Sequence, residues 1–385
     1  MSTGPTLVIH SGTFKTGSSA IQLYLNRADR YGVLAGAGAR YPATGRTTGI
    51  QHANLVAELR GDRVFMSGNG GWDALLSEMA THEARTTIVS SESFSTLTPA
   101  ELERLGDHCR RAGVAVRWVH YVREQAGFYN AFYVERIVAM RPDLLDVLNR
   151  PFEDFGEWSP IDLGFLSYAS FADRVRRGVP GVTLELRAFS REHLMDGDVV
   201  RDFCTTVGIP FDAALGARTN EGTGWRTVET ARRLLPLIRE FNIAHQVKRA
   251  PNRAAARQRW LQLIRAELVA SSTDVGWNVE PAIYMTAEHR ARLVEQYHEE
   301  NARLDTMVDF PWLGIIETTR MKPRNIGDFA TISAEELLSV MGRVAPVIYR
   351  MPEQVEKLVH PSDEPAPARS LARRAASVAR LRLRG

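Results

Sequence analysis

The chain has few cysteines, no long apolar run and no cluster of metal-ligating side chains. Cys109 and Cys204 are the two cysteines among 385 residues and lie far apart, which excludes a disulfide scaffold and favours a reducing compartment. No segment approaches the roughly 20 apolar residues that span a bilayer, and no basic stretch precedes an apolar one near the N-terminus. No His, Cys, Asp and Glu set has metal-ligand spacing. We therefore expect a cytoplasmic protein without a secretory signal and without a metal.

The charge of the chain is unevenly distributed. The formal net charge is +3, but the last 20 residues contain six arginines and no acid, so the remainder carries −3. Such a body is not expected to bind nucleic acid. For the basic tail, residues 361–385, a disordered segment is one interpretation and a weak interfacial helix at an anionic membrane is the other. The oligomeric state stays open.

The distribution of apolar residues predicts an α/β fold. Hydrophobic residues make up 44% of the chain and charged residues 24%, which allows a sizeable core in one large or two ordinary domains. Short apolar runs alternate with helical segments, as a buried and mostly parallel sheet requires. The expected strands are Thr6–His10, Thr86–Ser90, Val114–Val122 and Val182–Arg187. We predict a central, mostly parallel sheet flanked by helices, followed by a helical C-terminal part.

The division into parts follows the same patterns. Residues 1–312 are expected to form one domain that includes a helical insertion at about 228–270, and residues 313–360 an extension with a short helix at Ala334–Met341. The arginines of the insertion could form a lid over a substrate or an anion-binding surface, and the alternative is a solvated helix face. Glu288–Asp305 is expected to be one helix with a single buried stripe, formed by Leu293, Val294, Tyr297 and Leu304.

The segment Thr6–Leu25 has the pattern of a phosphate-binding turn. A buried strand leads into a turn rich in glycine, lysine and serine, and a helix follows. Glycines let the backbone approach a ligand, and the N–H groups that open a helix favour an anion. The expected binding residues are Gly12, Thr13, Phe14, Lys15, Thr16, Gly17, Ser18 and Ser19.

This turn differs from the Walker A loop of nucleoside-triphosphate enzymes. That loop has the order G-x-x-x-x-G-K-[ST], with the lysine directly after the second glycine. Here Lys15 comes two residues before Gly17. The order argues against a kinase or NTPase of a related fold, which remains an alternative.

The order H-x-G-x-x-K-T-G-S-S resembles the 5′-phosphosulfate loop of the sulfotransferases, which transfer a sulfuryl group from 3′-phosphoadenosine-5′-phosphosulfate (PAPS). The resemblance extends from about residue 6 to about 310 and implies a P-loop-like three-layer fold. It also implies that Lys15 contacts the 5′-phosphosulfate near its bridging oxygen, and that the residues after it hold the 5′-phosphate. PAPS is therefore the expected co-substrate.

Two residues are candidates for the general base of this reaction. Glu92 follows the strand Thr86–Ser90 within Ser91-Glu92-Ser93-Phe94, which is similar to the S-S-E-x-F of bacterial and carbohydrate sulfotransferases. A carboxylate there is placed to take the acceptor's proton, although it could instead cap the next helix or pair with an arginine. His52 could line the acceptor pocket or act as the base, and its alternative role is structural. The resemblance implies a carbohydrate or glycolipid acceptor.

Arg123 ends a strand that resembles the family's 3′-phosphate-binding segment. A guanidinium suits a phosphate because it makes paired, charge-assisted hydrogen bonds. The family's serine eight residues later is Ala131 here, so Asn130 or Tyr133 is expected to supply the missing hydrogen bond.

A polar loop at residues 218–226 completes the list of candidate sites. Arg218 could reach the 3′-phosphate, and Asn220-Glu221 resembles a pair found in related bacterial enzymes. The alternative is a connection without a function. The chain as a whole is expected to be a PAPS-dependent sulfotransferase, and the departure at Ala131 keeps open an inactive nucleotide-binding protein.

Overall fold

The computed structural model describes residues 4–47, 49–139, 163–216, 223–240, 251–318, 324–350, 353 and 355. Its described residues belong to two compact units. The first unit draws on 1–135, 149–225 and 278–326, and the second on 136–148, 226–277 and 327–385. Every candidate site residue in the described ranges lies in the first unit.

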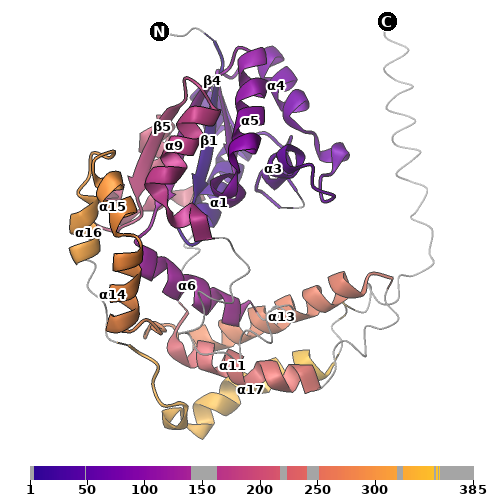
Figure 1. Ribbon diagram of the computed structural model, residues 1–385. Coiled ribbons are helices and arrows are strands. Elements are labelled where there is room, and N and C mark those ends of the chain that lie inside the picture. The colour runs from indigo at the N-terminus through magenta and orange to yellow at the C-terminus, as the bar shows by residue number, and fades with distance from the viewer. Residues whose placement is uncertain are drawn as a thin grey trace, which may run out of the picture. The chain divides into compact units, whose positions relative to one another are not determined.

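A five-stranded parallel sheet forms the centre of the first unit, with the strand order β2-β3-β1-β4-β5 (Figure 1). The strands are β1 Thr6–Gly12, β2 Ala39–Arg40, β3 Thr86–Ser90, β4 Ala115–Val122 and β5 Thr183–Ala188. The predicted α/β fold with a central parallel sheet is confirmed. β1 is longer than expected because Ser11 and Gly12 continue to pair with His120 and Tyr121 of β4 after the pairing with β3 has ended at His10.

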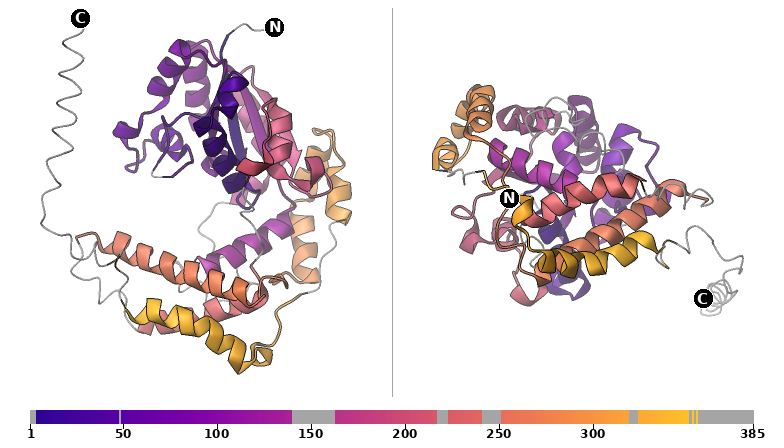
Figure 2. Two further views of the ribbon diagram at one scale, coloured as in Figure 1. Left: turned by 180° about the vertical axis from the view of Figure 1, so that it is seen from behind. Right: turned by 90° about the horizontal axis from the view of Figure 1, so that it is seen from below.

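Helices cover both faces of this sheet (Figure 2). Leu7 and Ile9 of β1 pack on one face, and Val8 packs on the other, so the strand has to be apolar throughout. The first face is covered by α3 Ala53–Arg60, α4 Trp72–Thr81, α5 Pro99–Arg111 and α9 Tyr168–Gly178. The second face is covered by α1 Ser18–Arg30, α2 Val33–Gly36 and α10 Val199–Val207.

The chain leaves the neighbouring strands β1 and β3 toward opposite faces of the sheet. β1 leads into α1 on the face of Val8, whereas the chain after β3 leads into α5 on the face of Leu7 and Ile9. Where two adjacent parallel strands diverge in this way, a crevice opens at their carboxyl ends, and ligands of open α/β sheets bind there. The loop after β1 and the segment after β3 meet at this position.

The helix expected at Glu288–Asp305 is two helices, α14 Ala287–Gln296 and α15 His298–Asp305. Tyr297 separates them with non-helical backbone angles. Leu293 and Val294 are only half-buried, so the prediction of one buried stripe was wrong. The break has a physical cause, because α15 is tied to other elements: Glu300 accepts hydrogen bonds from Ser170, and the side-chain oxygen of Asn301 accepts from Gln125 and Trp312.

The remaining helices complete the two units. They are α6 Gln125–Val138, α11 Trp225–Glu240, α13 Arg253–Asp274, α16 Trp312–Thr318 and α17 Ala334–Tyr349. In the second unit α13 packs against α17, and the indole of Trp260 donates to the carbonyl of Val347 (2.6 Å). The expected insertion and extension thus contribute helices to the same unit.

The helix α17 is longer than the predicted Ala334–Met341. Val340, Val344 and Ile348 recur every four residues and are buried, so the apolar face continues for two further turns. The expected tail, 361–385, lies outside the described residues. None of the helices in the described ranges combines the length and apolar character that crossing a membrane requires.

Candidate functional site

The loop between β1 and α1 is packed so tightly that its glycines cannot be replaced freely. A Cβ at Gly12 would collide with the hydroxyl of Thr16 and lie 3.3 Å from the carbonyl oxygen of Tyr121. Gly17 has a φ of 77°, and a Cβ there would lie 2.8 Å from Val199 Cγ1. The glycines therefore set the course of the loop, as the sequence predicts.

The same loop presents donors that have no acceptor. Within the described chain none of the backbone N–H groups of residues 14–19 donates a hydrogen bond, and no side chain caps α1. The hydroxyls of Thr13 and Ser18 are buried and also lack partners. The hydroxyl of Thr16 donates to Thr13 O (2.6 Å) and closes the turn. Free N–H groups at a helix N-terminus favour a bound anion, and the two buried hydroxyls are costly to leave unpaired.

Lys15 lies within this loop in a left-handed conformation (φ 68°). Its Nζ is 3.7 Å from Oε1 of Glu135 on α6, and about a third of each side chain is exposed. Its carbonyl oxygen accepts a hydrogen bond of 2.8 Å from Nη1 of Arg123. The backbone of Lys15 is thus fixed at the end of β4, while its ammonium group stays at the solvent-accessible edge of the loop.

Glu92 is the second residue after β3. Its carboxyl group faces the loop between β1 and α1. Burial raises the pKa of this carboxyl to about 7, and the negative charge of Glu135 adds to the rise. The positive charge of Lys15 and the nearby Ser18 hydroxyl both lower the pKa of Glu92. The Ser18 hydroxyl does so from a position that does not meet the geometry of a regular hydrogen bond. A carboxyl with this pKa can both take and release a proton near neutrality.

The other roles considered for Glu92 receive no support from the geometry. The short turn Glu92–Thr96 is capped by the Ser91 hydroxyl, which accepts from the N–H of Ser93 (3.3 Å). Within the described chain Glu92 forms no ion pair with an arginine. The arrangement favours the role of a base over that of a cap or an ion-pair partner.

His52 is fully buried, and both of its ring nitrogens are engaged. Nδ1 accepts from the N–H of Ser90 (3.1 Å), and Nε2 lies 2.9 Å from the carbonyl oxygen of Pro42, to which it donates. Burial lowers the pKa of this imidazole to about 3. The ring has no free lone pair for a proton, so the geometry favours the structural alternative. His52 ties the start of α3 to the end of β3.

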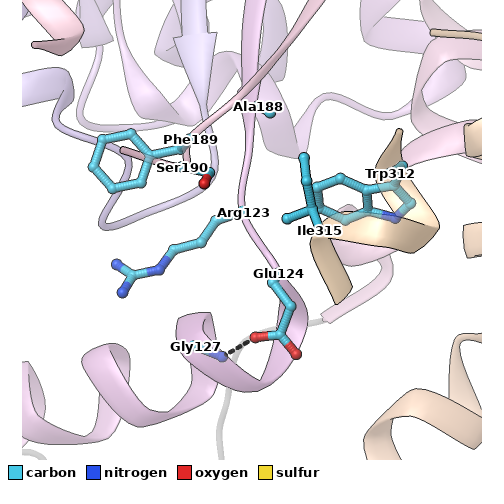
Figure 3. Close-up of a pocket in the computed structure, with 8 residues that line it drawn as sticks. All are labelled: Arg123, Glu124, Gly127, Ala188, Phe189, Ser190, Trp312 and Ile315. Atoms are coloured by element: carbon cyan, nitrogen blue, oxygen red, sulfur yellow. Dashed lines mark hydrogen bonds between the residues drawn. The ribbon is translucent and has the colours of Figure 1, made fainter. Parts of the chain in front are cut away.

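Arg123 lines a pocket at the carboxyl ends of β4 and β5 (Figure 3). The pocket holds about 190 Å³ of free space, less than the roughly 300–1,000 Å³ of clefts for drug-sized ligands, so it fits part of a nucleotide. Within the described chain Arg123 has no carboxylate partner at ion-pair distance. The lining residues are Arg123, Glu124, Gly127, Ala188, Phe189, Ser190, Trp312 and Ile315.

The two charged side chains of this pocket point in different directions in Figure 3. The guanidinium carbon of Arg123 lies 5.7 Å from the centre of the Phe189 ring. Glu124 turns toward α6, where its carboxylate accepts from the N–H of Gly127 (2.6 Å) and lies 3.9 Å from Nε of Arg290. The acid is thus occupied within the protein, whereas the guanidinium keeps donors for a ligand.

Asn130 does not offer the hydrogen bond that Ala131 lacks. Its Nδ2 donates to the carbonyl of Ala282 (3.1 Å), and its Oδ1 accepts from the N–H of Tyr284 (2.8 Å). The ring of Tyr133 is buried against that of Tyr284, with centroids 4.8 Å apart. Asn130 therefore fastens the segment before α14 to α6, and its expected role in ligand binding finds no support.

Sequence reasoning missed several residues of the site, among them Phe189, Ser190, Glu135, Trp312 and Ile315. Ser190 is half-buried in the pocket, and its hydroxyl has no hydrogen-bond partner in the described chain. Its position just after β5 was a usable signal, because ligand-binding residues follow strand ends. Glu135, Trp312 and Ile315 carried no such signal, since they come from helices. Arg218, Asn220 and Glu221 lie outside the described residues.

Among the described residues, no three His, Cys, Asp or Glu side chains are grouped so that they could hold a metal ion. Comparison with protein-family models, with curated proteins and with solved structures found no match for this chain.

Proposed function

We propose that the chain is a PAPS-dependent sulfotransferase with a P-loop-like three-layer fold, which transfers a sulfuryl group to a hydroxyl or amine of an acceptor. One observation carries the proposal: a loop of unpaired donors and a carboxyl with a pKa of about 7 lie on adjacent strands, at the point where the chain diverges. An anion-binding loop beside a general base is what group transfer from a phosphosulfate requires.

The residues of the first loop fit the 5′-phosphosulfate of the donor. The N–H groups of residues 14–19 and the buried hydroxyls of Thr13 and Ser18 are unpaired and can donate to its oxygens. Lys15 adds a positive charge whose only ion-pair partner in the described chain is at 3.7 Å. Hydrogen bonds to an anion are stronger than those to a neutral acceptor, and the N-terminus of a helix favours negative charge, so the loop favours an anion.

The pocket of Arg123 fits the 3′-phosphate, which distinguishes this donor from ATP and ADP. The guanidinium has donors to spare, and the hydroxyl of Ser190 lines the same pocket. Ser190 takes the place of the family's serine at Ala131, because Asn130 is bound to the segment before α14. The ring of Phe189 supplies an apolar wall on which part of the nucleotide can rest.

The reaction follows from these positions. The acceptor oxygen forms a bond to sulfur while the bond between sulfur and the bridging oxygen breaks, and the acceptor's proton passes to Glu92. Lys15 and the loop N–H groups stabilise the charge that develops on the departing bisphosphate. Removing one fixed donor from an oxyanion hole costs about 3–4 kcal/mol of transition-state stabilisation, and we expect a similar contribution here. The segment around Glu92 resembles S-S-E-x-F, and this resemblance implies that the acceptor is a carbohydrate or a glycolipid.

The test is a transfer assay with radiolabelled PAPS and a panel of sugars, glycolipids and amines, in the presence of a metal chelator. We expect labelled product from the native chain and about 10²- to 10⁴-fold slower product formation by Glu92→Gln. Glu83→Gln serves as the matched control. It removes a charge before the amino end of β3, whereas Glu92 follows the carboxyl end. A parallel assay uses radiolabelled ATP with Mg²⁺ and no chelator. Transfer there, with none from PAPS, would refute the proposal in favour of a kinase.

A further inference from the structure

Lys15 stands between two carboxylates that come from different elements. Glu135 on α6 lies 3.7 Å from its Nζ, and Glu92 after β3 is close enough for the lysine to lower the pKa of its carboxyl. The groups that act on Glu92 are Lys15 from the loop, Ser18 from α1 and Glu135 from α6. One cation thus serves two acids, and the cluster carries a net negative charge when all three are ionised.

The contact between Lys15 and Glu135 is easily exchanged. At 3.7 Å it is longer than a hydrogen bond, and both side chains are about one-third exposed. Ion pairs of this kind contribute little to stability. The backbone of Lys15 is held through its carbonyl by Arg123, so the ammonium can turn toward the loop without moving the chain. An anion bound by the N–H groups of residues 14–19 would compete for it directly.

We infer that Glu135 is a positioning residue that holds the Lys15 ammonium in the unliganded protein and releases it to an anion bound on the loop. The inference rests on the proposed function for the nature of that anion. Once Lys15 has turned to the donor, Glu92 keeps its acidic neighbour and loses its cation, so it binds a proton more readily. Donor binding is thereby coupled to the uptake of a proton by Glu92.

The resting part of this inference is tested without any ligand, by following the Glu92 carboxyl in a pH titration monitored by NMR. In Glu135→Gln we expect the midpoint to fall from about 7 toward the ordinary carboxyl range, because a like charge is gone and Lys15 is free to approach. Glu83→Gln removes the same charge at a position away from the cluster and serves as the control. It should leave the midpoint of the Glu92 titration unchanged. An unchanged or higher midpoint in Glu135→Gln overturns the inference.

The release of Lys15 is tested by calorimetric titration with adenosine 3′,5′-bisphosphate. Glu135→Gln should bind it about two- to fivefold more tightly than the native chain, because the competing carboxylate is gone. Glu135→Gln should also take up fewer protons than the native chain when the bisphosphate binds. Titrations in buffers of different ionisation enthalpy measure this proton uptake. Equal or weaker binding overturns the release. A native chain that binds no bisphosphate overturns the proposed function and the release together, while the NMR titration still decides the resting role of Glu135.

Discussion

The carboxyl ends of β1 and β3 differ from those of β4 and β5 in how their sites are built. At β1 and β3 the donors are mainly backbone groups of one short loop, and Glu92 follows its strand almost directly. At β4 and β5 the pocket is lined by residues that come from the ends of both strands and from the helices α6 and α16. The first site is therefore suited to any phosphate, whereas the second depends on side chains that can discriminate between nucleotides.

The largest effect is expected at the first site. Glu92→Gln should lower the turnover of PAPS about 10²- to 10⁴-fold, the usual contribution of a general base, while adenosine 3′,5′-bisphosphate binds at least as tightly as before. Steady-state kinetics and calorimetry on one preparation measure both quantities. A parallel loss of binding and turnover would mean that Glu92 builds the nucleotide site instead of acting on the acceptor.

Arg123→Ala probes the second site. We expect the affinity for adenosine 3′,5′-bisphosphate to fall about 10- to 100-fold, since hydrogen bonds to a charged group are lost. The affinity for ADP should fall less. Its loss comes only from the missing hydrogen bond between Arg123 and the carbonyl of Lys15, which fixes the loop. Equal losses for the two nucleotides would remove the distinction between the sites.

Gly17→Ala tests the packing of the loop against a matched position. Gly17 and Gly32 have nearly the same φ, 77° and 76°, but a Cβ at Gly32 would meet nothing within 4 Å. Both variants strain the backbone, and Gly17→Ala adds a collision with Val199, so we expect it to cost about 1–3 kcal/mol more in unfolding free energy. Denaturant melts measure the difference. Comparable costs would show that the loop yields at Gly17.

The raised pKa of Glu92 also predicts how stability depends on pH. Between the ordinary carboxyl pKa and about 7 the folded chain binds more protons than the unfolded one, so native stability falls as pH rises through this window. Glu92→Gln has no carboxyl group to ionise, so its free energy of unfolding does not fall in this window. It should exceed that of the native chain by about 1–2 kcal/mol at pH 8, a figure that allows for the partial exposure of the Glu92 side chain. The two chains should converge at low pH. Chemical denaturation across pH measures the gap, and a constant gap would refute the raised pKa.

The smallest effect is expected for Ser190→Ala. Losing one hydroxyl donor should weaken binding of adenosine 3′,5′-bisphosphate by about two- to tenfold and leave ADP binding unchanged. Thr205→Ala, on α10 and exposed, is a control for the same loss of a hydroxyl on the surface. If Ser190→Ala has no effect, another group replaces the serine missing at Ala131.

The difference between the two regions also explains what the sequence could predict. Apolar runs located four of the five strands to within two residues at either end, and the loop after β1 and Glu92 were predicted because their chemistry lies next to a strand. β2 was missed because Ala39–Arg40 is too short to show a pattern. Ser190 follows β5 and could have been found by the same rule, whereas Glu135 lies close to Lys15 only in the folded chain. The same holds for the break at Tyr297, which follows from the hydrogen bonds of α15.

His52 shows the limit of reasoning from residue type. An imidazole is a reasonable candidate for a base because its ordinary pKa lies near neutrality, but hydrogen bonds to Ser90 and Pro42 occupy both nitrogens of His52. Whether a polar side chain is available for chemistry depends on its partners, and these come from distant parts of the chain.

The most direct test of the account is a calorimetric titration of the native chain with adenosine 3′,5′-bisphosphate, beside ADP and ATP. We predict binding in the micromolar range with a clear preference for the bisphosphate. Lys15→Ala should weaken all three nucleotides, and Arg123→Ala should mainly remove the preference. No binding of the bisphosphate, or a preference for ATP, would contradict the assignment of the two sites and the proposed sulfotransferase function.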